Sequence, residues 1–271
     1  MPLIDSHAHL QADAFADDAG EVLAAARLAG VARMLVPGWD LESSRAAIAL
    51  AGAAGIDASA GIHPHVASGA DDSTWSAIVE LADHPAVVAI GETGLDYDRG
   101  FSPRAAQLVN LRRHLLLGRA LGKPVILHCR SKAGLRDAQD DLLRELASAG
   151  AGSARWPMPD DRPPALLHSF SGPIDYGAEA LAMGLAISFS GLVFRRGEEA
   201  SAEVARLVPG ERLLVETDSP YLSPPGAPRG RNEPYWVSVT ASWLADRRGE
   251  PATDLGQQLV AAYDRCFSRP G

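Results

Sequence analysis

Short apolar runs alternate with longer amphipathic stretches along the 271 residues of this chain. The apolar runs lie at 3–8, 32–37, 56–62, 86–91, 124–128, 165–168, 185–190 and 212–216. The amphipathic stretches lie at 18–29, 41–54, 73–83, 103–121, 134–149, 174–183, 198–207, 233–248 and 254–267. Strands that alternate with helices indicate parallel βαβ units. Because eight such units close naturally into a barrel, the pattern predicts an α/β protein with the (β/α)8 TIM-barrel fold.

A doubly wound sheet also alternates strands with helices, but it needs a glycine-rich phosphate-binding turn after an early strand. The first apolar run here ends in His7-Ala8-His9 instead, so the barrel is favoured. Apolar runs continue on both sides of the proline-rich segment 150–164, which we therefore predict to be a loop rather than a linker. The segment 219–234 is predicted to be a second long loop, and residues 1–271 to form a single domain.

The composition is that of an ordinary globular protein with an acidic balance. Hydrophobic residues make up 46% and charged residues 22% of the chain, and no run approaches the roughly 18 apolar residues that indicate a membrane span. The formal net charge is −9, whereas proteins that bind nucleic acid along extended surfaces are usually basic. Two cysteines, Cys129 and Cys266, are too few for a disulfide framework. We therefore expect a cytoplasmic protein with no membrane association and no obligate protein partner.

Residues of the types that ligate metals lie at the ends of several predicted strands. They are His7, His9, Glu92, His128, His168 and Asp218. A closed barrel brings the carboxyl ends of all its strands to one rim, so these side chains are expected to meet there. Four histidines and two carboxylates exceed what one four-coordinate ion uses, and they suit two ions about 4 Å apart.

The two carboxylates have different expected roles in such a site. Glu92 is the natural bridge, because each of its two oxygens can take one ion. Asp218 can be a ligand and can also accept a proton from an attacking water molecule, so both carboxylates are candidate catalytic residues. A pair of ions lowers the pKa of bound water and stabilises negative charge on an attacked phosphoryl or carbonyl centre.

The motifs around these residues are jointly specific. They are His-x-His at 7–9, Gly-x-His-Pro-His at 61–65, Gly-Glu-Thr-Gly-Leu-Asp-Tyr at 91–97, Leu-His-x-Arg at 127–130, His-x-Phe-Ser-Gly at 168–172, Glu-Thr-Asp-Ser-Pro-Tyr-Leu at 216–222 and Arg-Asn-Glu-Pro at 231–234. This set resembles the TatD family of metal-dependent deoxyribonucleases, within the amidohydrolase superfamily, from residue 3 to about residue 236. The chain departs from that family at Ser131 and Lys132, where an acidic residue is usual.

The resemblance implies a barrel of the metallo-dependent hydrolase type that cleaves phosphodiester bonds of DNA, often from the 3′ end. It implies that one ion is held by His7, His9 and Asp218. It implies that His128 and His168 hold the other ion and that Glu92 is shared. The substrate would be DNA ends, most simply single-stranded. The residue types leave the ions open among Mg²⁺, Mn²⁺, Zn²⁺, Fe²⁺ and Ni²⁺.

Substrate contacts are expected from the histidine-proline-histidine motif and from two loop arginines. His63 and His65 match the family motif that contacts substrate phosphate, although a proline-rimmed turn explains them equally well. Arg130 and Arg229 are candidate phosphate contacts. Aromatic residues near the strand ends could stack a nucleobase or could simply pack in the core. They are Trp39, Tyr97, Phe170, Tyr221 and Trp236.

Two rival functions follow from the same residues. A site with two ions can also hydrolyse esters, lactones or amides, including the aminoacyl ester of a charged tRNA, because activated water attacks a carbonyl carbon equally well. The other rival is a metal-stabilised barrel that only binds a ligand. We further hypothesise that Glu216, which shares a strand face with Asp218, pairs with Arg231 or Asn232.

Overall fold

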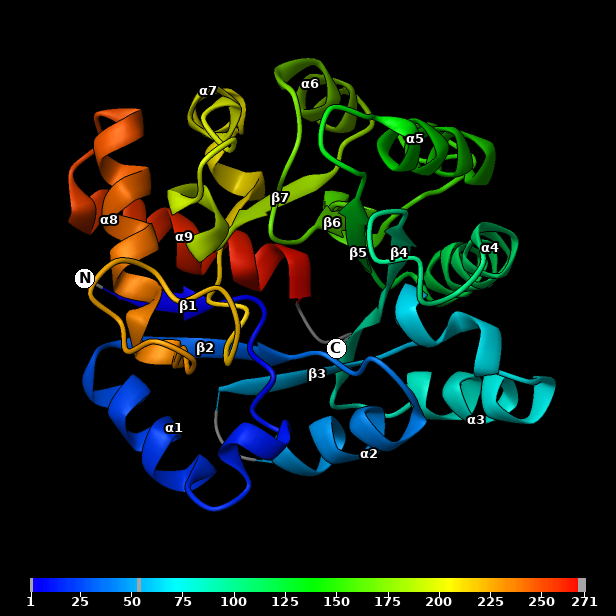
Figure 1. The fold of residues 1–271 in the computed structure, drawn as a ribbon, viewed down its shortest axis with the longest axis horizontal. Coiled ribbons are helices and arrows are strands. Elements are labelled where there is room, and N and C mark those ends of the chain that lie inside the picture. The colour runs from blue at the N-terminus through cyan, green and yellow to red at the C-terminus, as the bar shows by residue number, and fades with distance from the viewer. Residues whose placement is uncertain (1, 53–54, 268–271) are drawn as a thin grey trace.

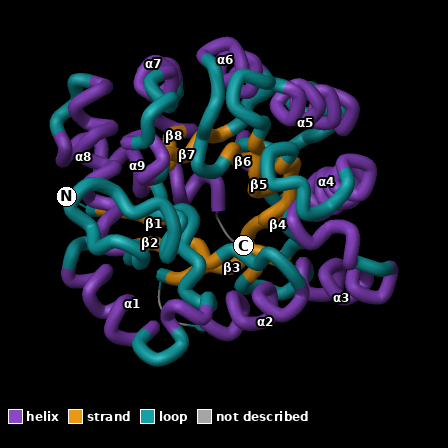
Figure 2. Tube along the Cα trace, viewed as in Figure 1, coloured by secondary structure: helices purple, strands orange, loops and turns teal. Residues whose placement is uncertain are grey.

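The computed structural model describes residues 2–52 and 55–267. In this part of the chain, parallel strands pair in sequence order from β1 to β8. The strands are β1 (Leu3–Asp5), β2 (Val31–Val36), β3 (Ile56–Ala60), β4 (Val87–Asp96), β5 (Val125–Arg130), β6 (Ala165–Leu167), β7 (Ala186–Phe189) and β8 (Leu213–Val215). The helices α1 to α8 lie outside this ring of strands (Figure 1; Figure 2, purple and orange). The predicted (β/α)8 barrel is confirmed.

The helices begin where the sequence offers suitable first residues. Asp40 caps α2, because its carboxylate accepts the Ser43 amide while the Ser43 hydroxyl accepts the Asp40 amide. Pro103 and Pro173 directly precede α4 and α6, where no backbone N–H is needed. The helices are α1 (Ala19–Leu28), α2 (Leu41–Leu50), α3 (Asp72–Ala82), α4 (Arg104–Leu121), α5 (Asp137–Ala149), α6 (Ile174–Ala182), α7 (Ala200–Leu207), α8 (Val237–Arg248) and α9 (Ala252–Phe267).

Some predicted boundaries differ from the structure. The helix predicted over 41–54 ends at Leu50, and residues 53 and 54 lie outside the described part of the chain. The first strand stops at Asp5 rather than at residue 8, and β4 continues to Asp96 rather than stopping at residue 91. The segments 150–164 and 219–234 connect regular elements as loops, as predicted. None of the described helices combines the length and apolar character needed to span a membrane.

The ring of strands is joined at the seam between β1 and β8. The Ser6 amide donates to the Val215 carbonyl at 3.0 Å. The buried Asp5 carboxylate accepts the amide of Thr217 at 3.0 Å and its hydroxyl at 2.6 Å. A single bridge between Ala8 and Ser219 continues the pairing beyond both strands. The seam therefore fixes the two loops that leave β1 and β8 relative to each other.

The last helix, α9, lies within the outline of the ring rather than outside it (Figure 1). Its buried Tyr263 donates its hydroxyl to Asp57 Oδ2 of β3 at 3.0 Å, and Asp57 is only 1% exposed. Arg33 of β2 approaches the same carboxylate oxygen at 3.7 Å. This polar contact ties the C-terminal helix to the barrel.

Replacing Tyr263 with phenylalanine is expected to destabilise the fold without changing the metal-type residues at the ends of the strands. The change removes a hydrogen bond to a buried charged group, which contributes about 1.5–3 kcal/mol. Urea denaturation should show that loss in the free energy of unfolding. Tyr235→Phe is the matched control, since Tyr235 is only half-buried. Equal unfolding free energies for the two variants would show that the contact with Asp57 contributes nothing.

Candidate metal centre

The seam between β1 and β8 brings His7, His9 and Asp218 together. The Asp218 amide donates to the His7 carbonyl at 2.9 Å, and the His9 amide donates to the Ser219 carbonyl at 2.8 Å. His9 Nε2 consequently lies 3.3 Å from Asp218 Oδ1 and 3.2 Å from His7 Nε2. His7 Nε2 lies 3.8 Å from the same carboxylate oxygen. Three potential ligand atoms therefore face one small, largely buried space.

Glu92 joins this group to a second group of histidines. Its side chain is 3% exposed, and Oε2 lies 3.3 Å from His7 Nε2. The other oxygen, Oε1, lies 2.9 Å from His168 Nε2, 3.3 Å from His128 Nδ1 and 3.2 Å from His63 Nε2. The two carboxylate oxygens thus point to different sets of imidazoles, which is the geometry expected of a bridging ligand.

The local course of β4 sets the position of Glu92. The register between β4 and β5 shifts between Ile90 and Thr93, and an extra residue of this kind re-aims the side chains near it. Gly94 has φ of +138°, and a Cβ there would lie 1.9 Å from the His128 carbonyl oxygen. Only glycine lets β4 pass this close to β5, so the glycines of the Gly-Glu-Thr-Gly motif bring Glu92 and His128 together.

Two further carboxylates hold the outer nitrogens of the second group. Asp96 Oδ2 lies 3.3 Å from His128 Nε2, and Glu216 Oε1 lies 3.2 Å from His168 Nδ1. Because an ionised carboxylate can only accept, each imidazole donates its proton there. The other ring nitrogen faces Glu92 and is the one that could ligate an ion. Carboxylates placed in this way orient metal-binding histidines and fix their tautomers.

The hypothesis from the sequence that Glu216 pairs with Arg231 or Asn232 is wrong. Arg231 pairs with Asp18 at 2.7 Å, and Asn232 donates to the Thr217 carbonyl at 2.9 Å. Glu216 is fully buried beneath His168 instead. Asp96 Oδ1 accepts the amides of Asp98 and Arg99 in a turn after β4. The sequence reasoning missed its contact with His128. A strand extended to residue 96 was the missing signal, since it carries Asp96 to the rim alongside His128.

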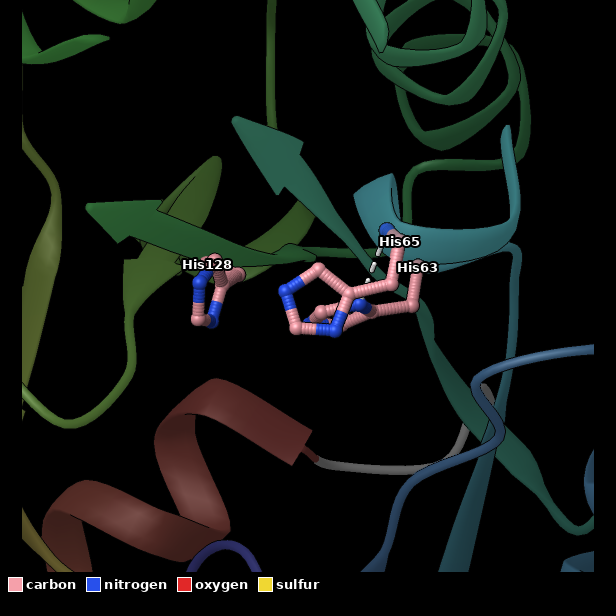
Figure 3. Close-up of side chains that lie close together, drawn as sticks. All are labelled: His63, His65 and His128. Atoms are coloured by element: carbon pink, nitrogen blue, oxygen red, sulfur yellow. Dashed lines mark hydrogen bonds between the residues drawn. The ribbon is translucent and has the colours of Figure 1, made fainter. Parts of the chain in front are cut away.

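The histidine-proline-histidine motif lies beside the second group, in the 3-10 helix Pro64–Gly69 and the residue before it. His63 and His65 come from this loop and face His128 of β5 (Figure 3). His63 Nδ1 accepts the His65 amide at 3.1 Å, so its proton is on Nε2, which faces Glu92. His65 Nε2 donates to Asp96 Oδ2 at 2.7 Å and its side chain is 31% exposed. Both imidazoles are thus placed as hydrogen-bond donors at the edge of the centre.

The two predicted arginines lie farther out. Arg130 ends β5, two residues after His128, and its Nε donates to Asp98 Oδ2 at 2.8 Å. Its side chain is about half exposed. Arg229 is exposed in the loop 219–234. Both residues are accessible, and the role of each as a phosphate contact stays a prediction.

The charges of the centre oppose one another at close range. Burial alone would raise the pKa of Glu92, but His168, His63 and His7 hold it well below its usual range. Burial alone would lower the pKa of His168, but Glu92 and Glu216 raise it well above its usual range. Burial dominates at His63 and lowers its pKa to about 4. The centre is therefore an ionised carboxylate surrounded by imidazoles.

The donor atoms fit divalent cations. Among the described residues, three sets have ligand atoms within 4.8 Å of one another. They are His7 with His9 and Asp218, His7 with Glu92 and His168, and His63 with His65 and His128. Mixed imidazole and carboxylate donors are typical of sites for Zn²⁺, Mn²⁺, Fe²⁺ or Ni²⁺. The rim of this barrel can therefore hold metal.

Known proteins resemble the chain over nearly its whole length. The family model described as TatD related DNase matches residues 4–268. The 3′-5′ ssDNA/RNA exonuclease TatD of Cronobacter sakazakii is 39% identical over 272 residues, covering 98% of this chain and 97% of the relative. The protein of the same name from Klebsiella pneumoniae is 38% identical, with the same coverage.

Solved structures agree on the fold. YJJV, a TatD homologue from Escherichia coli K12, superposes with a TM-score of 0.85 at 25% identity, covering 99% of this chain and 98% of that one. A TatD family hydrolase from Entamoeba histolytica has a TM-score of 0.84 at 21% identity, covering 100% and 99%. The family-model match over residues 4–268 and the relatives at 38–39% identity show that the chain belongs to the family of TatD-related DNases.

Proposed function

We propose that this chain is a divalent-metal-dependent exonuclease that removes nucleotides from the 3′ ends of single-stranded DNA or RNA. The observation that carries the proposal is Glu92, whose two carboxylate oxygens face two separate sets of imidazoles at the rim. The relatives named above as 3′-5′ ssDNA/RNA exonucleases, which align with almost the entire chain, support the choice of substrate.

The residues divide between two ions in this proposal. His7, His9 and Asp218 would hold one ion, His128 and His168 would hold the other, and Glu92 would bridge them. Such ions act as Lewis acids, and they lower the pKa of a bound water molecule toward neutral pH. Mg²⁺, Mn²⁺, Zn²⁺, Fe²⁺ and Ni²⁺ all remain candidates for the donor set.

Asp218 is the proposed acceptor of the proton released when water attacks phosphorus. Burial alone would raise its pKa, but the hydrogen bond from His9 and the charge of His7 lower it, so its carboxylate is ionised and can take a proton. Its backbone φ of +54° is unusual for a residue other than glycine and is held by the bond from its amide to His7. Such local strain is typical of functional sites.

The substrate phosphate would be held by donors that surround the ions. His63 is neutral near pH 7, because burial keeps its pKa at about 4. Its Nε2 proton faces Glu92 in this structure, and a phosphate bound beside Glu92 would compete for that proton. His65 adds a second, more exposed imidazole. Arg130 and Arg229 would contact neighbouring phosphates. With free thiols at Cys129 and Cys266, the chain suits a reducing compartment, and we propose that it acts in the cytoplasm.

Removal and return of metal tests this function. Purified protein is treated with chelator, dialysed, and incubated with a 3′-labelled or 5′-labelled single-stranded oligonucleotide with and without Mn²⁺ or Mg²⁺. We expect no cleavage without metal, and with metal a ladder that shortens stepwise from the 3′ end. An intact oligonucleotide with metal demonstrably bound, together with hydrolysis of p-nitrophenyl esters, would replace this proposal with an esterase or lactonase function.

A further inference from the structure

Two exposed aromatic rings lie against histidines of the metal centre. Phe101 is 66% exposed and Tyr221 is 60% exposed, and in the described part of the chain no other phenylalanine, tyrosine or tryptophan is as exposed. The Phe101 ring lies 4.8 Å from that of His65, and the Tyr221 ring lies 5.9 Å from that of His9. Single exposed apolar residues need no explanation, but these two both sit at the site.

The two rings contact different ends of a series of imidazoles at the centre. Tyr221 contacts His9, which belongs to the seam between β1 and β8, whereas Phe101 contacts His65, which belongs to the loop after β3. The imidazoles between them form a continuous series. Successive centroids lie 4.8 Å apart from His9 to His7, 4.0 Å from His7 to His168, 5.6 Å from His168 to His128 and 5.9 Å from His128 to His65.

Phe101 is exposed from a loop that is firmly anchored. The next residue, Ser102, is 2% exposed, donates its hydroxyl to the His65 carbonyl at 2.9 Å and accepts the Ser68 amide at 3.1 Å. Its own carbonyl accepts Gln107 Nε2 at 2.8 Å. The phenylalanine is thus presented to solvent by a fixed backbone rather than by a frayed loop.

Tyr221 is presented in a similar way. Its amide donates to the Asp218 carbonyl at 2.8 Å, so the backbone of Tyr221 is fixed relative to Asp218. A neutral aromatic face held over a metal centre is suited to stack against a nucleobase.

We infer that Phe101 and Tyr221 are stacking surfaces for the nucleobases on either side of the scissile phosphate. The inference rests on the nuclease function proposed above. Stacking requires an unpaired base, so these rings would favour single strands, and it tolerates any base because every base has a π-face. With a net charge of −9, the protein gains little general attraction to phosphate, so stacking would supply a large share of substrate affinity.

The test pairs aromatic variants with substrates that lack one base. Phe101→Ala and Tyr221→Ala are compared with Leu116→Ala, a matched control on the exposed face of α4. Substrates are a single-stranded oligonucleotide and two versions with one abasic nucleotide, at the 3′ end or at the next position. Loss of one stack should raise KM roughly 5- to 100-fold with kcat nearly constant, and Mn²⁺ affinity should be unchanged.

Coupling between ring and base decides the inference. Each alanine variant should be indifferent to removal of the base that its ring stacks, while still responding to removal of the other base. Tyr221→Phe and Phe101→Tyr, which keep a ring, should recover most of the affinity lost in the alanine variants. The inference would be overturned if removing a ring and removing a base had fully additive effects on KM at both positions. Unchanged KM in the alanine variants would also overturn it. Wild-type protein that cleaves no oligonucleotide would instead overturn the nuclease function itself.

Discussion

Glu92→Gln is expected to reduce metal binding and nuclease activity more than any other single substitution in this chain. Glutamine has nearly the same shape, but it is neutral and offers one amide oxygen where the carboxylate offers two. Either Oε2, which faces His7, or Oε1, which faces His128 and His168, must be replaced by an NH₂ group. That group cannot ligate a cation and confronts imidazole nitrogens that need an acceptor or an ion.

The expected loss exceeds about 100-fold in both Mn²⁺ affinity and kcat/KM, since even residues that only orient ligands cost 10- to 100-fold. Isothermal titration with Mn²⁺ measures the first quantity, and cleavage of a single-stranded oligonucleotide measures the second. Glu203→Gln is the matched control, because Glu203 pairs with Arg206 on the exposed surface of α7. A Glu92→Gln protein that bound Mn²⁺ with the affinity and stoichiometry of the wild type would show that the carboxylate bridges nothing.

The features that were predictable from the sequence are those that depend on local pattern or on barrel closure. The capping of α2 by Asp40 depends only on neighbours in the chain. The gathering of His7, Glu92 and His168 at one rim follows from their positions after parallel strands, once the barrel is assumed. Spacing alone was enough because each strand end contributes to the same edge.

The features that were not predictable depend on which side of a ring faces which neighbour. The contact between Glu216 and His168 depends on which nitrogen of the His168 ring faces Glu216. Residue types and spacing do not fix the orientation of that ring. The structure extends β4 to Asp96 with a register shift near Glu92, whereas the apolar pattern in the sequence ends at residue 91. The exposure of Phe101 depends on the anchoring of Ser102 by a distant loop.

Asp96 provides the second large expected effect, because all of its acceptor capacity is used. Oδ1 accepts the amides of Asp98 at 3.0 Å and Arg99 at 2.8 Å. Oδ2 accepts His65 Nε2 at 2.7 Å and His128 Nε2 at 3.3 Å. Burial alone would raise the pKa of this carboxyl, but the bonds from His128 and His65 hold it well below its usual range. Four donors therefore depend on one ionised side chain.

Asp96→Asn keeps the shape of the side chain and removes half of its acceptors. If the amide oxygen faces the two backbone amides, the NH₂ group faces His65 and His128. His128 Nε2 must then accept, and its proton moves to Nδ1, the nitrogen that faces Glu92. A protonated nitrogen cannot ligate a metal. The opposite orientation of the amide leaves two buried backbone amides facing donors, which destabilises the turn.

The Asp96→Asn protein is therefore expected to lose 10- to 100-fold in affinity for the ion proposed near His128 and His168, while the ion proposed near His7, His9 and Asp218 is retained. Titration with Co²⁺, followed by its visible absorption, should change from two similar binding steps to one tight and one weak step. Asp98→Asn is the control for metal affinity, since its carboxylate pairs with Arg130 and, within residues 2–52 and 55–267, forms no ion pair with an imidazole of the centre. A purely structural role for Asp96 would lower the melting temperature but leave the two steps alike, and that outcome would refute the assignment of Asp96 as the residue that sets the tautomer of His128.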